Sequence, residues 1–325
     1  MSLKLNKPYS SHPYFKDWIH ALKSPFRHTL KREFTLSGIG IHSGTICQIT
    51  CRPLTQPRGY ILNGIPLAHY RLTSSTFATQ IQSLDCKSSV CIETPEHLLA
   101  ALWAAGIDDV EIESSHSECP ILDGSSWQWI TCVQPCLTSS SVSSSPAGYP
   151  RTLFIPQNAM SWFFQESSLT WSPFSTRSNF LISSDSEFPF PHFHIDWSPD
   201  LPCLNREVIH SSVFTPAELL TRVIPARTFG WRSQETYLRD QGLIKGVSND
   251  NCCIFEKDGT VHTPLRDPDE PALHKILDLI GDLTLIGQGR VSGRFDIKRG
   301  SHALNHTCIE EMRENSHLNS PFFLL

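Results

Sequence analysis

The apolar and polar positions of the chain form a regular pattern from Phe34 onward. Residues 34–37 and 46–51 alternate as half-buried strands do, and a glycine-rich turn segment, residues 38–44, lies between them. Residues 107–113 have the character of a further strand. The pattern therefore predicts three strands in this part of the chain.

A helix is predicted between the second and third of these strands. Thr94 is of a type favoured at the N-cap, Pro95 suits the first helical position, and the run Leu98–Trp103 consists of good helix formers. Gly106 supplies a C-terminal stop. Further helices are expected near residues 127–133, 234–241 and 271–285.

The clearest domain boundary lies at residues 137–150. Six of the seven residues from Ser139 to Ser145 are serine, and prolines and a glycine follow, which is the composition of a linker. The strands and helices on either side predict an α+β fold of two similar-sized domains, residues 33–136 and 151–325.

The first 32 residues differ from the rest of the chain. They carry seven Lys or Arg and a single acid, Asp17, with aromatic residues but no clear apolar period. Targeting segments are basic and poor in acids in this way, and a disordered extension can have the same composition. Both interpretations stay open.

Composition and charge exclude several classes of protein. Of the 325 residues, 39% are hydrophobic and 18% are charged, which is enough apolar surface to bury a core and excludes a wholly disordered chain. The formal net charge of −5 argues against general electrostatic binding to nucleic acid. The sequence has no uninterrupted apolar run long enough for a membrane-spanning helix.

Eleven cysteines and fifteen histidines are the unusual feature, because both residue types bind metals. The cysteines are odd in number and spread over the whole chain, and no Cys-x-x-Cys pair occurs. We expect them to be buried free thiols, not disulfides. The histidines are therefore more informative.

The predicted helix 271–285 offers a candidate metal site. One face is an apolar stripe, and the opposite face carries His274, Lys275, Asp278 and Asp282. His274 and Asp278 lie one turn apart and can bind a common ion, and an imidazole with a carboxylate suits zinc or iron better than magnesium. A solvated polar helix face is the alternative.

Glu96 and His97, in the first turn of the earlier helix, supply what this pair lacks. His97 would be a third protein ligand and leave one position open, as in catalytic zinc sites, and Glu96 would be the adjacent general base. Alternatively, Glu96 only complements the helix dipole. The absence of a His-Glu-x-x-His motif weakens a metallopeptidase interpretation.

Two short segments add candidates. His302 lies among small residues and can act as a protonated acid or bind an anion. The hydroxyl of Thr228, in an apolar-flanked turn, can stabilise an oxyanion. An ordinary surface histidine and an ordinary turn residue are the alternatives.

Taken together, seven segments resemble the zinc-dependent UDP-3-O-acyl-N-acetylglucosamine deacetylases, the committed-step enzymes of lipid A synthesis. The segments occur in the order of that family and cover most of residues 33–310. They are Ser37–Gly44, Thr94–Leu99, Pro120–Ser125, Ala226–Gly230, Gly242–Gly246, His274–Asp282 and Gly300–Asn305.

The resemblance implies two α+β domains with the active site at their interface, and a Zn²⁺ cofactor. His97, His274 and Asp278 match the zinc ligands of the family, and Glu96 matches the base that activates the zinc-bound water. His302 matches a charged histidine that protonates the leaving amine or stabilises the tetrahedral intermediate.

Supporting roles follow from the same resemblance. Asp282 is placed to orient the charged histidine, and Thr228 and Lys275 match groups that hold the oxyanion and position the substrate. Phe229 would lie near the passage for the acyl chain, for which an insert is expected in the second domain. His42 matches the histidine of the N-terminal signature loop.

The resulting prediction is a hydrolase that removes the N-acetyl group of UDP-3-O-acyl-N-acetylglucosamine. We expect a cytoplasmic monomer with peripheral membrane contact at most and no nucleic-acid partner, or an imported enzyme if residues 1–32 are a transit peptide. The alternative is a catalytically degenerate homologue that binds a nucleotide sugar, a lipid or another protein. The intact set of candidate ligands, base and acid argues against that alternative.

Overall fold

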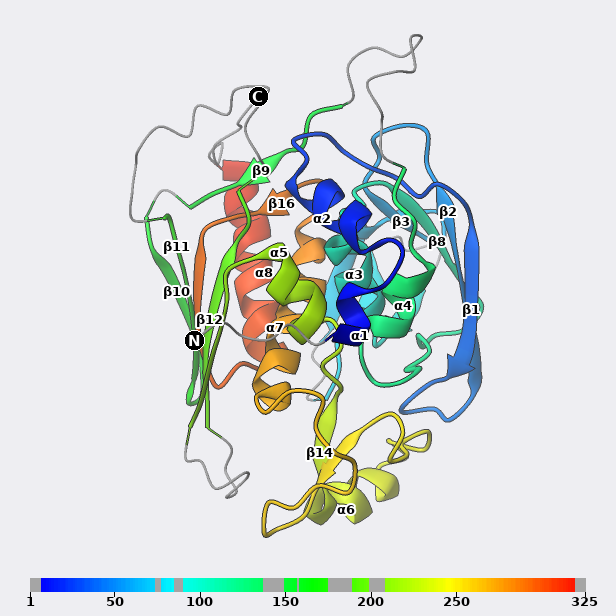
Figure 1. Cartoon of the computed structure of the whole chain (residues 1–325), viewed down its shortest axis with the longest axis vertical. Coiled ribbons are helices and arrows are strands. Elements are labelled where there is room, and N and C mark those ends of the chain that lie inside the picture. The colour runs from blue at the N-terminus through cyan, green and yellow to red at the C-terminus, as the bar shows by residue number, and fades with distance from the viewer. Residues whose placement is uncertain are drawn as a thin grey trace.

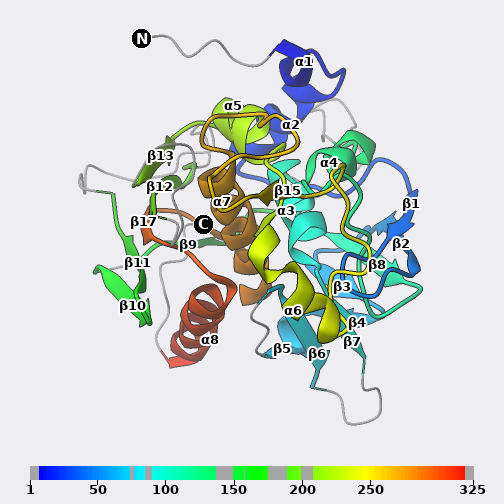
Figure 2. The same ribbon diagram turned by 90° about the horizontal axis from the view of Figure 1, so that it is seen from below.

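Two five-stranded sheets form the outer layers of the protein, and helices lie between them (Figures 1 and 2). The computed structural model describes residues 7–73, 77–84, 90–136, 149–156, 158–174, 189–198 and 208–318. The mixed α+β class expected from the sequence is confirmed, and each half of the chain contributes one of the two sheets.

The N-terminal half builds the first sheet, in the strand order β1-β2-β8-β3-β4. Its strands are β1 (Phe34–Ile39), β2 (Ile46–Pro53), β8 (Val110–Ser114), β3 (Tyr60–Leu62) and β4 (Ile65–Pro66). The three strands predicted here are therefore present, and Cys47, Ile49 and Cys51 on alternate positions of β2 are fully buried. A smaller sheet follows, made of β5 (Tyr70–Thr73), β6 (Gln80–Ser83) and β7 (Cys91–Glu93).

The C-terminal half builds the second sheet, in the order β10-β11-β17-β12-β13. Its strands are β10 (Met160–Phe164), β11 (Ser167–Ser172), β17 (Arg294–Lys298), β12 (His192–Trp197) and β13 (Ile209–Val213). An insert of this half projects beyond the sheets at the bottom of Figure 1. The insert consists of β14 (Phe229–Trp231), α6 (Glu235–Asp240) and β15 (Cys253–Phe255).

The helical layer joins the two halves. Its helices are α3 (Glu96–Ala104), α4 (Trp127–Cys132), α5 (Pro216–Glu218) with the π-helical turn Leu219–Val223, α7 (Glu270–Leu283) and α8 (His302–Leu318). The buried apolar residues of both halves form one continuous core around them. The close packing of α3 on α7 depends on Gly281, where a Cβ atom would lie only 2.2 Å from the carbonyl oxygen of Glu96.

Helix α3 is buried on every side, as its apolar sequence requires. It ends as predicted at Gly106, which has a φ of 78° and forms the two hydrogen bonds of a Schellman motif, together with Ile107. The predicted N-cap is wrong, because the Thr94 side chain makes no capping hydrogen bond and donates instead to the carbonyl oxygen of Cys119, 3.2 Å away.

The N-terminal segment corrects one expectation. Disorder was one interpretation of residues 1–32, but their described part contains α1 (Lys7–Ser10) and α2 (Phe15–Lys23), and Trp18 of α2 is fully buried. The Trp18 indole donates a hydrogen bond of 2.8 Å to the carbonyl oxygen of Val133, and its ring stacks on that of His12. Helix α2 is therefore part of the core.

Several sequence-based expectations concern the surface and the connections. Most of the expected linker, residues 137–148, lies outside the described residues. The short strands β9 (Leu153–Phe154) and β16 (Arg290–Val291) pair beside its end. The nine cysteines in the described part are free thiols.

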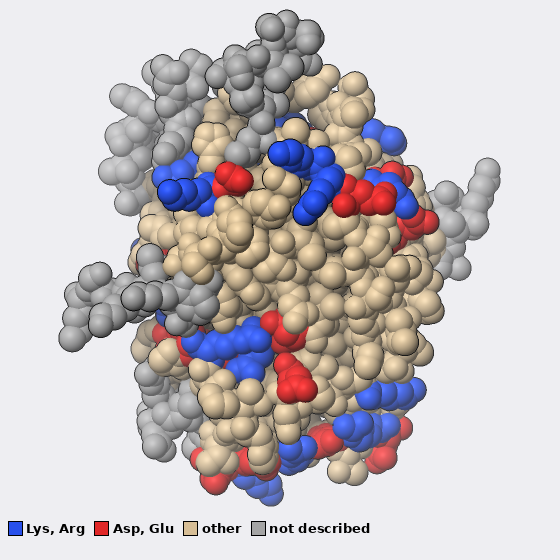
Figure 3. All heavy atoms as spheres, turned by 45° about the vertical axis from the view of Figure 1, so that its right-hand side comes forward, with Lys and Arg blue, Asp and Glu red and all other residues tan. Residues whose placement is uncertain are grey.

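The described helices include none with the length and hydropathy needed to cross a bilayer. On the face seen in Figure 3, Lys and Arg side chains are interspersed with Asp and Glu, so this face carries no large basic patch of the kind that nucleic-acid binding uses.

Candidate active site

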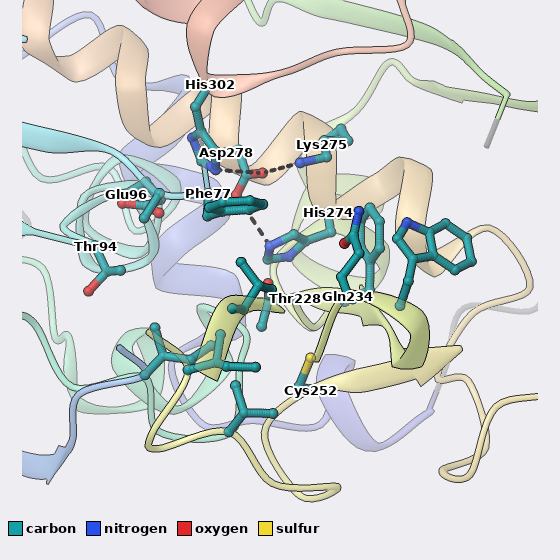
Figure 4. Close-up of a pocket in the computed structure, with 18 of the residues that line it drawn as sticks. Phe77, Thr94, Glu96, Thr228, Gln234, Cys252, His274, Lys275, Asp278 and His302 are labelled. Atoms are coloured by element: carbon teal, nitrogen blue, oxygen red, sulfur yellow. Dashed lines mark hydrogen bonds and ion pairs between the residues drawn. The ribbon is translucent and has the colours of Figure 1, made fainter. Parts of the chain in front are cut away.

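Three buried side chains meet where α3 packs on α7. His97 comes from the first turn of α3, and His274 and Asp278 come from successive turns of α7. One ligand atom of each lies within 4.8 Å of the other two, and the residues are 4%, 2% and 2% exposed. The solvated helix face considered as an alternative is therefore wrong for this part of α7 (Figure 4).

The hydrogen bonds of this trio leave ligand atoms free. The Nδ1–H group of His274 donates to the carbonyl oxygen of Ala226 at 3.0 Å, which leaves Nε2 unprotonated and 3.3 Å from Asp278 Oδ1. His97 Nδ1 and Asp278 Oδ1 are buried and have no hydrogen-bond partner among the described residues. Such atoms are costly in a protein interior unless an ion completes them.

Electrostatics keep the trio in the form that binds a metal. Burial, reinforced by His274, lowers the pKa of His97 to about 3, so its imidazole is neutral. Burial also lowers the pKa of His274. Burial alone would raise the pKa of Asp278, but its electrostatic interactions with His274, Lys275 and His302 outweigh that effect and lower it. A deprotonated carboxylate beside two neutral imidazoles is a metal-ligand set.

Glu96 precedes this trio in sequence and shares its cavity. Its side chain is almost fully buried, and Oε1 accepts a long hydrogen bond of 3.4 Å from the backbone N–H of Thr79. In the part of the chain that the structure describes, Oε2 has no hydrogen-bond partner. Burial raises the pKa of Glu96, and the neighbouring His302 opposes that rise. Two residues earlier, Thr94 has a φ of 53°, a conformation that a β-branched residue adopts only under local strain.

His302 lies at the start of α8, across the cavity from Glu96. Its Nε2 is 3.6 Å from Asp278 Oδ2, and its Nδ1 is 3.6 Å from Asp282 Oδ2. Burial alone would lower the pKa of His302, but Asp278, Asp282 and Glu96 outweigh that effect and raise it. His302 is therefore a cation held among carboxylates.

One cavity of about 660 Å³ contains nearly all of the predicted site residues. Asp282 is the exception, because it lies fully buried behind His302. The members that line the cavity are His42, Glu96, His97, Thr228, Phe229, His274, Lys275, Asp278 and His302. The projecting insert supplies an apolar wall of the same cavity through Trp231, Leu238, Ile244 and Ile254.

Backbone contacts fix the two loops that bring Thr228 and His42 to this cavity. The N–H group of Thr228 donates to Gly124 at 2.7 Å, and its carbonyl accepts from Cys253 at 2.9 Å. The backbone N–H group of His42 donates at 2.7 Å to Glu118, a buried carboxylate, and its carbonyl accepts from Lys245 of the insert at 3.2 Å. The signature loop therefore links the first sheet to the insert.

Lys275 lies between the ligand trio and the apolar wall. Its ammonium group is 3.2 Å from Asp278 Oδ2 and 5.3 Å from the centre of the Phe229 ring, within the range of a cation–π contact. Figure 4 shows Lys275 and His302 on either side of Asp278.

The structure adds residues that the sequence did not single out. Thr79 is fully buried and contacts both Asp282 and His302, and Phe77 lines the mouth of the cavity. Nothing in the local sequence marks either residue. Asn305 donates to Asp282 at 2.9 Å. Its position one helical turn after His302 could have identified it as a neighbour of that residue from the sequence.

Comparison with known proteins identifies the family. The model of the UDP-3-O-acyl N-acetylglycosamine deacetylase family matches residues 27–314. The chain belongs to this family. It is 34% identical over 290 residues to a UDP-3-O-acyl-N-acetylglucosamine deacetylase of Thermosynechococcus vestitus, and the alignment covers 87% of this chain and 92% of the relative. It is 30% identical over 301 residues to the deacetylase of that name from Chlamydia felis, and this alignment covers 88% of this chain and 98% of the relative.

The region matched by this deacetylase family contains every predicted site residue. Helices α1 and α2 both lie before the matched region, since α2 ends at Lys23. Residues of α2 nevertheless pack into the core of the fold. The structure therefore combines the family fold with a preceding helical segment.

Proposed function

We propose that this chain is a zinc-dependent hydrolase that removes the N-acetyl group of UDP-3-O-acyl-N-acetylglucosamine, the committed step of lipid A biosynthesis. The observation that carries the proposal is the buried trio His97, His274 and Asp278, with the unpartnered carboxylate oxygen of Glu96 beside it in one cavity. Membership in the deacetylase family supplies the substrate class.

The residues of the trio fit zinc. Two imidazoles and one carboxylate are the donors of many catalytic zinc sites, and three protein ligands leave one position for water or substrate. The buried unpartnered atoms of His97 and Asp278 support this assignment. Zinc, when bound, supplies a Lewis acid that polarises a carbonyl group and lowers the pKa of water.

Glu96 then acts as the general base. No described residue donates a hydrogen bond to its Oε2 atom, so this atom is available to take the proton of the attacking water. The raised pKa of Glu96 lies closer to neutral pH. A group whose pKa is near the working pH can both take up and release a proton efficiently.

His302 and Thr228 complete the reaction. The cationic His302 stabilises the tetrahedral intermediate and gives a proton to the departing amine, because its pKa is raised by the surrounding carboxylates. Asp282 orients His302, and Lys275 holds Asp278 and positions the substrate. The Thr228 hydroxyl lines the cavity and is assigned to the oxyanion.

The substrate would lie along the cavity. The apolar wall contributed by the insert suits an acyl chain, with Phe229 at its inner end beside His274. His42 closes the opposite side through the signature loop. Since one chain supplies all these walls, we propose a monomer that meets its amphiphilic substrate from the cytoplasm, at the membrane surface.

The decisive experiment measures metal content and acetate release together. Purified protein should contain close to one zinc per chain and release acetate from the UDP-linked substrate, and a chelator should abolish release until zinc is restored. His274→Ala should lower the zinc-to-protein ratio, whereas the exposed control His116→Ala should keep it. An unchanged ratio in His274→Ala, or acetate release that chelation leaves intact, would contradict the proposal.

A further inference from the structure

We propose that Thr79 is a positioning residue that couples the acid His302 to its carboxylate Asp282 and at the same time holds the base Glu96. The inference rests on the proposed function for the roles of Glu96 and His302. Thr79 lies just before β6, outside the motifs that the sequence marked, and it is fully buried.

The side chain of Thr79 bridges two charged groups whose own ion pair is longer than either contact with Thr79. Its Oγ1 lies 2.5 Å from Asp282 Oδ1 and 3.2 Å from His302 Nδ1, whereas His302 Nδ1 is 3.6 Å from the nearest Asp282 oxygen. A carboxylate accepts only, so the hydroxyl proton of Thr79 goes to Asp282. The Thr79 oxygen therefore accepts from the Nδ1–H group of His302.

This hydrogen-bond chain fixes the orientation of the His302 ring. With the Nδ1–H group committed to Thr79, the Nε2–H group lies on the side of Asp278 and the cavity. Partners of this kind, one step removed from the reacting atoms, commonly change activity by about 10–100-fold when they are removed.

The backbone of Thr79 acts on the opposite group. Its N–H group donates to the Glu96 carboxylate at 3.4 Å, and its carbonyl accepts from Thr94 at 2.9 Å. Thr94 is the strained residue that precedes the turn into α3. One buried residue therefore fixes the separation of base and acid.

Other polar groups secure the arrangement around Thr79. Asn305 Nδ2 donates to the second oxygen of Asp282 at 2.9 Å, and His306 Nε2 lies 3.4 Å from the Thr79 hydroxyl. Asp282 therefore stays in place when the hydroxyl is removed, and the expected damage is confined to the orientation of His302.

The test replaces the hydroxyl at constant volume. Thr79→Val should lower kcat by about 10–100-fold with KM and zinc content unchanged, and Thr79→Ser, which retains a hydroxyl, should recover most of the loss. The matched control is Thr221→Val, which removes another buried hydroxyl that bonds a helix carbonyl away from the cavity, and it should leave kcat unchanged.

A coupled variant distinguishes positioning from a general structural effect. In a His302→Gln background, Thr79→Val should cause little further loss, because both changes act through the same group. Independent, multiplicative losses would overturn the proposal, as would a Thr79→Val enzyme with intact kcat.

Nitrogen NMR of the His302 ring separates this proposal from the proposed function. The Nδ1–H signal should show a hydrogen bond to Thr79 in the parent protein and lose it in Thr79→Val, whether or not acetate is released. A parent protein with this hydrogen bond but no deacetylation would refute the proposed function alone. An unchanged Nδ1–H signal in Thr79→Val would refute the bridge alone.

Discussion

Helix α3 has a buried charged cluster at each end. At its N-terminus are the catalytic candidates Glu96 and His97 with their partners from α7 and α8. At its C-terminus lies a second cluster around Asp108, which we call the Asp108 cluster, formed with Arg151 and Arg290. All of these side chains are less than a tenth exposed, so burial by itself does not distinguish them.

Hydrogen bonding does distinguish the two ends. In the Asp108 cluster, each carboxylate oxygen of Asp108 accepts from an arginine, at 2.8–3.1 Å, and the arginines also bind backbone carbonyls at the ends of α2 and α3. In the catalytic cluster, three atoms have no hydrogen-bond partner within the described ranges: Glu96 Oε2, His97 Nδ1 and Asp278 Oδ1. Each such atom costs about 1–3 kcal/mol when buried alone.

The difference separates a structural role from a catalytic one. Buried polar atoms that already have hydrogen-bond partners gain nothing from a ligand, whereas buried atoms without partners can be completed by a bound ion or substrate. The positive groups near the last carbonyls of α3 also complement its dipole, while the first turn faces the cavity. We expect substitutions at the two ends to affect different measurements.

The largest effect is expected at the catalytic end. Glu96→Gln should lower kcat for deacetylation by about 1,000-fold through loss of the base, while zinc binding and the free energy of unfolding stay near those of the parent. Acetate release, metal analysis and urea unfolding measure the three quantities. Glu113→Gln, at an exposed carboxylate of β8, is the control. Near-normal turnover by Glu96→Gln would remove the assignment of the base.

The next effect is expected at the structural end. Asp108→Ala should lower the free energy of unfolding by about 3–5 kcal/mol, because it leaves Arg151 and Arg290 buried without their counter-ion. Activity per folded molecule should be retained. Chemical denaturation compares this variant with Asp250→Ala at an exposed position. Equal stability of the two variants would show that the Asp108 cluster is not structural.

The N-terminal helix, which the Asp108 cluster anchors, gives the third effect. Arg151 donates to the carbonyl oxygens of Ala21 and Leu22 at the end of α2, and Trp18 fills the core. Trp18→Ala should cost about 3 kcal/mol of unfolding free energy, whereas Phe163→Ala, at an aromatic residue that is 73% exposed, should cost much less. A small loss of unfolding free energy in Trp18→Ala would indicate that the core does not need helix α2.

The effect that is smallest at neutral pH is a pH dependence beside the Asp108 cluster. Burial, reinforced by Arg151, lowers the pKa of His28 to about 4 in the folded protein, whereas the unfolded chain titrates near the ordinary histidine value of 6.5. Below pH 6.5 the unfolded chain binds a proton that the folded chain does not, so stability falls as pH decreases from 6.5 to about 4.

Through His28, the free energy of unfolding changes by at most about 1.4 kcal/mol per pH unit, and the change levels off outside this pH range. His28→Gln should flatten the dependence of unfolding free energy on pH, and the exposed His116→Gln should not. Parallel curves for His28→Gln and the parent protein would exclude His28 as the source.

Local elements were predicted well because local sequence determines them. The expected helix 271–285 is α7 with its following turn, and the expected helices near 127–133 and 234–241 are α4 and α6. Apolar periodicity and glycine stops act within a few residues. The predicted N-cap at Thr94 was wrong because a contact with Cys119, far along the chain, overrides its local preference.

The candidate site was predictable only in part. The spacing of His274 and Asp278 placed them one turn apart, and Glu96, His97 and His302 were candidates from their own local sequence. The family resemblance then joined these residues into one site. Nothing in the sequence pointed to Thr79, because its contacts reach Asp282 and His302, about two hundred residues away. The order of the N-terminal segment was also missed, since Trp18 depends on partners such as Val133.

The sequence alone determined the α+β class, the main helices and strands, and the residue types that could bind a metal or move a proton. These depend on periodicity, capping chemistry and side-chain identity. Tertiary structure decided which polar residues are buried, which of their atoms lack partners, and which charges face one another. Long-range packing, such as that of α3 on α7 at Gly281, controls all three, because solvation and charge separation are properties of the folded chain.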